Sequence, residues 1–229
     1  MKKLILFVGA LCLLAQVSLA QDCSKFYPLK NATKFQLTSY DKKDKVTATV
    51  DYEVMEVNAT ETGEKATVKN IIKDDKGEVI VESTVEMTCE NEVVSMDFKS
   101  MVSPLMYEQY SDMDIELNGT NLEYPNNLAE GDQLADADVQ MKLKMSGVNM
   151  NMNIKVSDRK VIGKETITTP AGTFDCFIIS YNTEMKLGIR QQNSAKQWMA
   201  EGVGLVKQVD YKKNGKVLST TLLTQIIKS

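Results

Sequence analysis

Residues 79–89 read VIVESTVEMTC, and the even alternation in this stretch decides the fold class. Every second position from Val79 to Cys89 carries Val, Ser, Met or Cys, and the positions between them are mostly polar. A period of two is typical of a β-strand that buries one face. Similar runs recur along the chain about every ten residues, and helical periodicity is nearly absent. The sequence therefore predicts an all-β, mainly antiparallel protein.

Turn residues separate the predicted strands. Gly77 ends the sequence DDKG and Gly215 ends KKNG, which places a glycine where a hairpin needs positive φ. One short helix is predicted over residues 105–110, because Ser103 can cap it and Pro104 suits its first turn. Residues 124–132 are predicted to form an ordered loop. The predicted strands are 33–40, 46–57, 66–73, 78–88, 93–99, 114–117, 139–145, 148–156, 160–168, 173–181, 194–199, 205–211 and 216–227.

The first twenty residues predict export. Lys2 and Lys3 form a basic start, residues 4–14 are almost wholly apolar, and Ser18-Leu19-Ala20 fits a signal-peptidase site. The apolar run is too short for a lasting transmembrane span. Neither Cys12 nor Cys23 follows a lipobox. We expect a signal peptide at 1–20, a single exported β domain at 21–229, and a location in the periplasm or at the cell exterior.

Composition excludes several classes of function. The chain of 229 residues has no histidine, which removes His-based hydrolysis and the commonest zinc ligand. Without the two lysines of the signal peptide, 25 basic residues face 31 acids, a net charge of −6. With arginine only at positions 159 and 190, nucleic acid is not an expected partner. We expect no cofactor and no metal.

Three cysteines remain after the predicted cleavage. Cys89 and Cys176 both lie in alternating runs and point to an apolar face, so we expect a disulfide between them in an oxidising compartment. Cys23, near the mature terminus, is expected to be the unpaired thiol.

The most unusual composition lies in residues 139–156, where methionine alternates with lysine and asparagine. Thioethers can bind Cu(I), but methionine more commonly fills the irregular interior of a curved sheet. A flexible apolar face of this kind also suits a groove for lipid-like ligands. The residues expected to line it are Met141, Leu143, Met145, Met150, Met152 and Ile154.

Carboxylates offer the alternative chemistry. Acids gather at 112–116 and 130–138, but neither cluster follows a calcium-loop pattern, and a solvated face explains both. A glycosidase would need two acids at a set separation in space, which no local pattern identifies. The lone Trp198, beside a predicted turn, is expected to anchor the core.

Three stretches together resemble a family of exported proteins of Bacteroidetes-type bacteria for which no activity is established. They are TPAGTF at 169–174, WMAEGVGLVK at 198–207 and the loop YPNNLAEGD at 124–132. The structural residues of these motifs are Pro170, Gly172, Phe174, Trp198, Gly202 and Gly204.

That family is distantly similar to lipoprotein carriers of the LolA/LolB type. The resemblance implies a strongly curved sheet or open half-barrel with an apolar hollow, and it supplies no catalytic residue. We therefore expect a non-catalytic, monomeric envelope protein that binds an apolar small molecule or an envelope protein segment. The alternatives are a carboxylate-based enzyme acting on envelope glycans and a structural or surface interaction module.

Overall fold

The structure is a computed structural model that describes residues 23–97, 114–145, 148–187 and 189–228. Thirteen strands and no helix occur in these residues, and the all-β prediction is confirmed. None of the described residues belongs to a helix that could span a membrane. The predicted signal peptide and the predicted helix at 105–110 lie outside the described residues. The strands are β1 (Lys34–Asp41), β2 (Val46–Ala59), β3 (Gly63–Asp74), β4 (Val79–Glu90), β5 (Val93–Met96), β6 (Asp114–Gly119), β7 (Leu122–Pro125), β8 (Ala137–Met145), β9 (Val148–Thr169), β10 (Gly172–Leu187), β11 (Ile189–Ala200), β12 (Gly204–Lys212) and β13 (Val217–Ile227).

All thirteen strands form one sheet in the order β6-β8-β9-β10-β11-β12-β13-β1-β2-β3-β4-β5-β7. Every neighbouring pair is antiparallel, and the sheet ends on β6 and β7 without closing. Antiparallel order places the turns β1–β2, β3–β4, β10–β11 and β12–β13 at one end of the sheet. The turns β2–β3, β4–β5, β9–β10 and β11–β12 lie at the other end.

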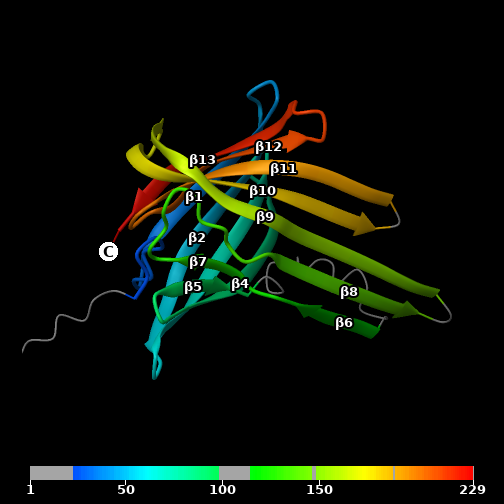
Figure 1. The fold of residues 1–229 in the computed structure, drawn as a ribbon, viewed down its shortest axis with the longest axis horizontal. Coiled ribbons are helices and arrows are strands. Elements are labelled where there is room, and N and C mark those ends of the chain that lie inside the picture. The colour runs from blue at the N-terminus through cyan, green and yellow to red at the C-terminus, as the bar shows by residue number, and fades with distance from the viewer. Residues whose placement is uncertain (1–22, 98–113, 146–147, 188, 229) are drawn as a thin grey trace, which may run out of the picture.

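The sheet is strongly curved, as the family resemblance implies. Figure 1 shows β9–β13 on one side of the interior and β2–β5 with β7 on the other. Register shifts interrupt seven of the twelve ladders between described strands, and each shift adds local bend and twist. One such irregularity lies at Asp158, a non-glycine residue with φ of 54°. The expected break between strands 148–156 and 160–168 is therefore a bulge inside the single strand β9.

The turns follow the predicted chemistry. Gly77 and Gly215 have φ of 84° and 77°. The Asp74 carboxylate accepts hydrogen bonds from the backbone N–H groups of Lys76 and Glu78, at 2.9 and 2.8 Å. Asp and Asn favour such turns because their side chains bond the backbone two to four residues on.

The expected loop at 124–132 is partly a strand. Residues Tyr124 and Pro125 end β7, whose partner is β5. The chain then runs beside β9, where the Leu134 N–H donates to the Arg159 carbonyl at 2.9 Å. A four-residue edge strand is too short to produce a readable alternation, so the prediction missed it.

Two apolar cores lie on opposite faces of β10. The concave core contains Phe177 and Ile179, whereas the second core contains Cys176, and adjacent residues of a strand point to opposite faces. The end of β9 approaches β12 and β13, which are not its sheet neighbours, and this covers the second core. The buried residues of the concave core are Phe26, Tyr27, Leu29, Val54, Ala66, Val68, Met87, Cys89, Val94, Tyr124, Leu128, Leu134, Val161, Phe177, Ile179 and Met199.

Candidate functional site

The predicted ligand-binding residues lie on two paired strands. The register pairs Met141 of β8 with Met152 of β9, and Leu143 with Met150. Directly paired residues of an antiparallel ladder point to the same face. The sheet therefore brings Met141 and Met152 to one face, with Ile154 two residues further along β9.

Met141 and Met152 are too buried to contact a ligand in the observed conformation. Met141 is 1% exposed and Met152 is 7% exposed. Ile154 is half-buried, and the side chains of Leu143, Met145 and Met150 lie outside the described part of the chain. The two methionines thus belong to a packed interior, and a role in ligand binding stays a prediction.

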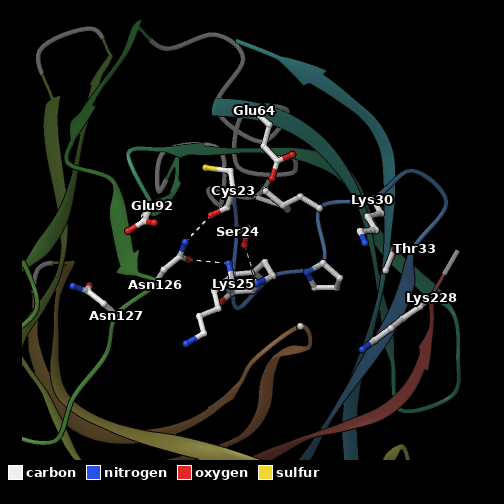
Figure 2. A pocket seen from close by; sticks show the side chains of 14 residues that line it. Cys23, Ser24, Lys25, Lys30, Thr33, Glu64, Glu92, Asn126, Asn127 and Lys228 are labelled. Atoms are coloured by element: carbon white, nitrogen blue, oxygen red, sulfur yellow. Dashed lines mark hydrogen bonds between the residues drawn. The ribbon is translucent and has the colours of Figure 1, made fainter. Parts of the chain in front are cut away.

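The N-terminal segment, residues 23–33, occupies the hollow of the curved sheet. Figure 2 shows this segment running inside the ring of strands. Phe26, Tyr27 and Leu29 are buried in the concave core. The Phe26 ring meets Phe177 edge-on at 5.9 Å between centroids, and Tyr27 meets Tyr124 in the same way at 5.9 Å. The hollow is therefore filled at this end by the chain itself.

Asn126, directly after β7, fixes the backbone of this segment. Its side-chain amide donates to the Cys23 carbonyl at 2.6 Å and accepts from the Lys25 N–H at 2.8 Å. One amide thereby satisfies a donor and an acceptor on the same short stretch, which holds it in one register against the sheet.

The β11–β12 turn holds the segment from the other side. The Gly202 N–H donates to the Lys25 carbonyl at 2.8 Å, and Lys25 forms an ion pair with Glu201. Gly204, with φ of 86°, lies against the Tyr27 ring so closely that a Cβ would stand 2.8 Å from two ring carbons. The glycines of the WMAEGVGLVK stretch thus allow the turn to approach the N-terminal segment.

The disulfide joins Cys23 to Cys89, so the predicted Cys89–Cys176 pair is wrong. Cys176 is free and buried in the second core, whereas Cys89 lies in the concave core. The alternation of β10 correctly placed Cys176 on an apolar face, but this strand has an apolar face on each side. Cys23 is not at a frayed end, because its segment is packed inside the sheet.

Of the other motif residues, Trp198 is buried in the second core and Phe174 packs against it, whereas Pro170 and Gly172 are exposed. Pro170 and Ala171 form the β9–β10 turn, Gly172 begins β10, and the Phe174 ring lies 3.3 Å from the position of a Cβ on Gly172. Trp198 is 6% exposed, as expected of a core anchor, and its indole N–H donates to Glu165 at 2.7 Å. These residues stabilise the strand ends that carry the β11–β12 turn.

Arg159 was not singled out by sequence reasoning, yet it fastens β9 to the edge of the sheet. It is 1% exposed, and its guanidinium donates to the carbonyls of Ala135 and Glu123 at 2.7 and 2.9 Å. It also lies 4.8 Å above the centroid of the Tyr124 ring. The only available signal was an arginine placed where the alternation of residues 157–160 breaks.

A cavity of about 740 Å³ adjoins the N-terminal segment at this end of the sheet. Its walls come from that segment, from the nearby turns and from the C-terminal Lys228 (Figure 2). The Thr33 hydroxyl beside it is buried and has no hydrogen-bond partner among the described residues. The remaining lining residues are Cys23, Ser24, Lys25, Tyr27, Pro28, Leu29, Lys30, Glu64, Glu92, Asn126, Asn127 and Gly202.

Carboxylates in the described residues lack the environment of an acid catalyst. No described Asp or Glu side chain is buried. Partial burial raises the pKa of Asp51, but hydrogen bonds from Lys73 and Gln36 outweigh it and leave that pKa below its usual value. A general acid requires the opposite shift. Among the same residues, no three His, Cys, Asp or Glu side chains gather as a metal site would require.

The free thiol is not activated either. Burial, with help from the charges of Asp175 and Glu165, raises the pKa of Cys176 to about 11. Since the thiolate is the nucleophile, this cysteine is almost wholly protonated near neutral pH.

An open, strongly curved antiparallel sheet with its own N-terminal segment in the hollow defines a half-barrel protein. The chain belongs to the DUF3108-like family, whose profile matches residues 30–223. No functionally curated protein matches the sequence.

Two solved structures share this fold. One is a candidate exported protein of Bacteroides fragilis with a YmcC-like fold, at 22% identity and a TM-score of 0.74. The other is a candidate lipoprotein of Parabacteroides distasonis, at 26% identity and a TM-score of 0.73. Each comparison covers 90% of this chain and 100% of the other. These neighbours agree with the predicted resemblance to exported proteins of Bacteroidetes-type bacteria, whereas the likeness to lipoprotein carriers stays a prediction.

Proposed function

We propose that this protein is a non-catalytic protein of the bacterial envelope whose concave sheet face holds an apolar ligand or an apolar segment of a partner. One observation carries the proposal. The concave face already accommodates an extended apolar segment, because Phe26, Tyr27 and Leu29 of the chain itself are buried there. A surface that packs aromatic and aliphatic groups from an irregular segment suits other guests of the same chemistry.

The apolar surface continues beyond that segment. Tyr181 follows Ile179 on the same face of β10, and it packs with Val156 of β9. The next pair along these strands is Ile154, two residues from Val156 on β9, with Met185, four residues from Tyr181 on β10. Met185 is 42% exposed, so the stripe reaches solvent at the end of the sheet away from the N-terminal segment.

An envelope location is supported by two independent lines. The first twenty residues have the composition of a signal peptide. The neighbours of known structure are described as candidate exported and lipoprotein chains. The absence of histidine and the solvated carboxylates support a binding role over catalysis.

A fluorescent long-chain fatty acid, cis-parinaric acid, tests the proposal. We expect saturable binding to the mature protein and a loss of affinity of about tenfold in Met185→Gln, because a polar amide would replace an apolar contact at the exposed end of the stripe. Asn151→Gln is the matched control, since Asn151 is exposed on the opposite face of β9. Absence of saturable binding, or equal losses in the two variants, would contradict the proposal.

A further inference from the structure

Two neighbouring hairpin turns carry an unusual concentration of lysine. The β1–β2 turn contains Lys42, Lys43 and Lys45, and the β12–β13 turn region contains Lys212, Lys213 and Lys216. The turns are adjacent because β13 pairs with β1, with Asp41 opposite Ser219. Figure 1 shows both turns side by side at the top of the sheet. We call these six lysines, together with Val46, Val217 and Leu218, the basic rim.

The charge of the basic rim opposes that of the molecule. The whole chain has a net charge of −4, whereas the two rim turns contain six lysines and two acids, Asp41 and Asp44. The neighbouring β3–β4 turn adds Asp74, Asp75 and Glu78 beside Lys76, so the excess of positive charge is confined to the two rim turns. The Asp41 carboxylate is engaged in the turn, where it accepts from the N–H groups of Lys43 and Lys45 at 2.7 and 3.0 Å.

Several lysines on the strands are paired with carboxylates. Lys65 forms an ion pair with Glu86, Lys69 with Glu82 and Lys34 with Glu53 across the ladders. Within the described part of the chain, no carboxylate lies at ion-pair distance from a rim lysine. The rim turns therefore present an excess of positive charge, six lysines against Asp41 and Asp44.

Apolar side chains stand among these charges. Val46 is 39% exposed, and Val217 and Leu218 are each 40% exposed. Lysines beside exposed aliphatic residues match the interface of an anionic bilayer, where ammonium groups meet phosphates and apolar groups enter the boundary region. We propose that the basic rim docks the protein on a bilayer that contains anionic phospholipid. This goes beyond the proposed function and is independent of it.

Binding to vesicles tests the docking surface. The probes are vesicles of phosphatidylcholine alone and vesicles with about 30% phosphatidylglycerol, each with the mature protein in a flotation assay. We expect binding only to the anionic vesicles, and we expect about 0.5 M salt to abolish most of it. Equal binding to both kinds of vesicle, or none to either, would overturn the proposal.

Two triple variants of equal net charge separate the rim from general electrostatics. The rim variant carries Lys212→Gln, Lys213→Gln and Lys216→Gln, and we expect roughly a hundredfold weaker binding to the anionic vesicles. The control carries Lys160→Gln, Lys196→Gln and Lys228→Gln, which are exposed and lie outside the turns at that end of the sheet. We expect its affinity to stay within about threefold of the wild type. Equal losses in the two variants, with unchanged thermal unfolding in both, would overturn the rim as the docking surface.

Discussion

Gly204→Ala tests whether the N-terminal segment is seated on the β11–β12 turn. An alanine at φ of 86° costs about 1–2 kcal/mol, because its Cβ crowds the backbone in the left-handed region. The same Cβ would also stand 2.8 Å from the Tyr27 ring, and overpacking of this kind costs about 1–3 kcal/mol. We therefore expect a loss of roughly 2–5 kcal/mol in the free energy of unfolding.

Gly77→Ala is the matched control. Gly77 has φ of 84°, but nothing lies within 4 Å of its added Cβ, so only the backbone cost of about 1–2 kcal/mol applies. Urea unfolding followed by the fluorescence of the single Trp198 gives both values. In a Tyr27→Ala background, the excess loss at Gly204 should disappear. Equal losses at the two glycines in the wild-type background would refute the seating of Tyr27.

Three further predictions concern interactions that stabilise the sheet: the disulfide, the Arg159 hydrogen bonds and the Asp51 carboxylate. Non-reducing peptide mapping should yield a Cys23–Cys89 peptide. Replacing both cysteines with Ala should lower the free energy of unfolding by up to about 4 kcal/mol, since the bridge closes a loop across a separation of 66 residues. An unchanged free energy of unfolding in that variant would contradict a stabilising role of the bridge. Arg159→Ala should lower stability by about 2–4 kcal/mol in the same urea assay, because two buried carbonyls lose their donor, whereas the exposed Arg190→Ala should cost less than about 1 kcal/mol. The lowered pKa of Asp51 adds stability that is present above about pH 5 and is lost as the pH falls through its folded pKa. The free energy of unfolding of Asp51→Asn should therefore fall less steeply on acidification than that of the wild type. An identical pH dependence in the two proteins would refute this contribution.

The strands were predictable because apolar and polar residues alternate regularly along most of them. The run from Val79 to Cys89 is a strand, and the glycine hairpins at Gly77 and Gly215 are where turn chemistry places them. Local pattern is sufficient when one face of a strand is buried and the other is solvated. The same logic failed for Cys176, because β10 is buried on both faces and alternation cannot say which neighbour lies across each face.

The occupied hollow was beyond reach of local pattern. Residues 23–33 have no periodicity, and their burial depends on Asn126 and Gly204, which are more than 90 residues away in the sequence. Arg159 posed the same difficulty, since its partners are backbone carbonyls that leave no trace in side-chain composition. The strand positions of Met141 and Met152 were predictable because their alternation is local, whereas their role in ligand binding stays a prediction.

The sheet order puts the first and the last described strand side by side in the middle of the sheet. β13, the last strand, is the seventh of thirteen, and it pairs with β1 from Lys34 opposite Ile227 onward. During synthesis or translocation from the N-terminus, β1 can therefore pair with β2 early, but it can pair with β13 only after almost the whole chain has emerged. Closing so long a loop is slow, and strand pairing connects the two wings of the sheet only through β13. A chain shortened before β13 would lose a central strand and not an edge strand, so β12 and β1 would each be left without a hydrogen-bonded neighbour on one side.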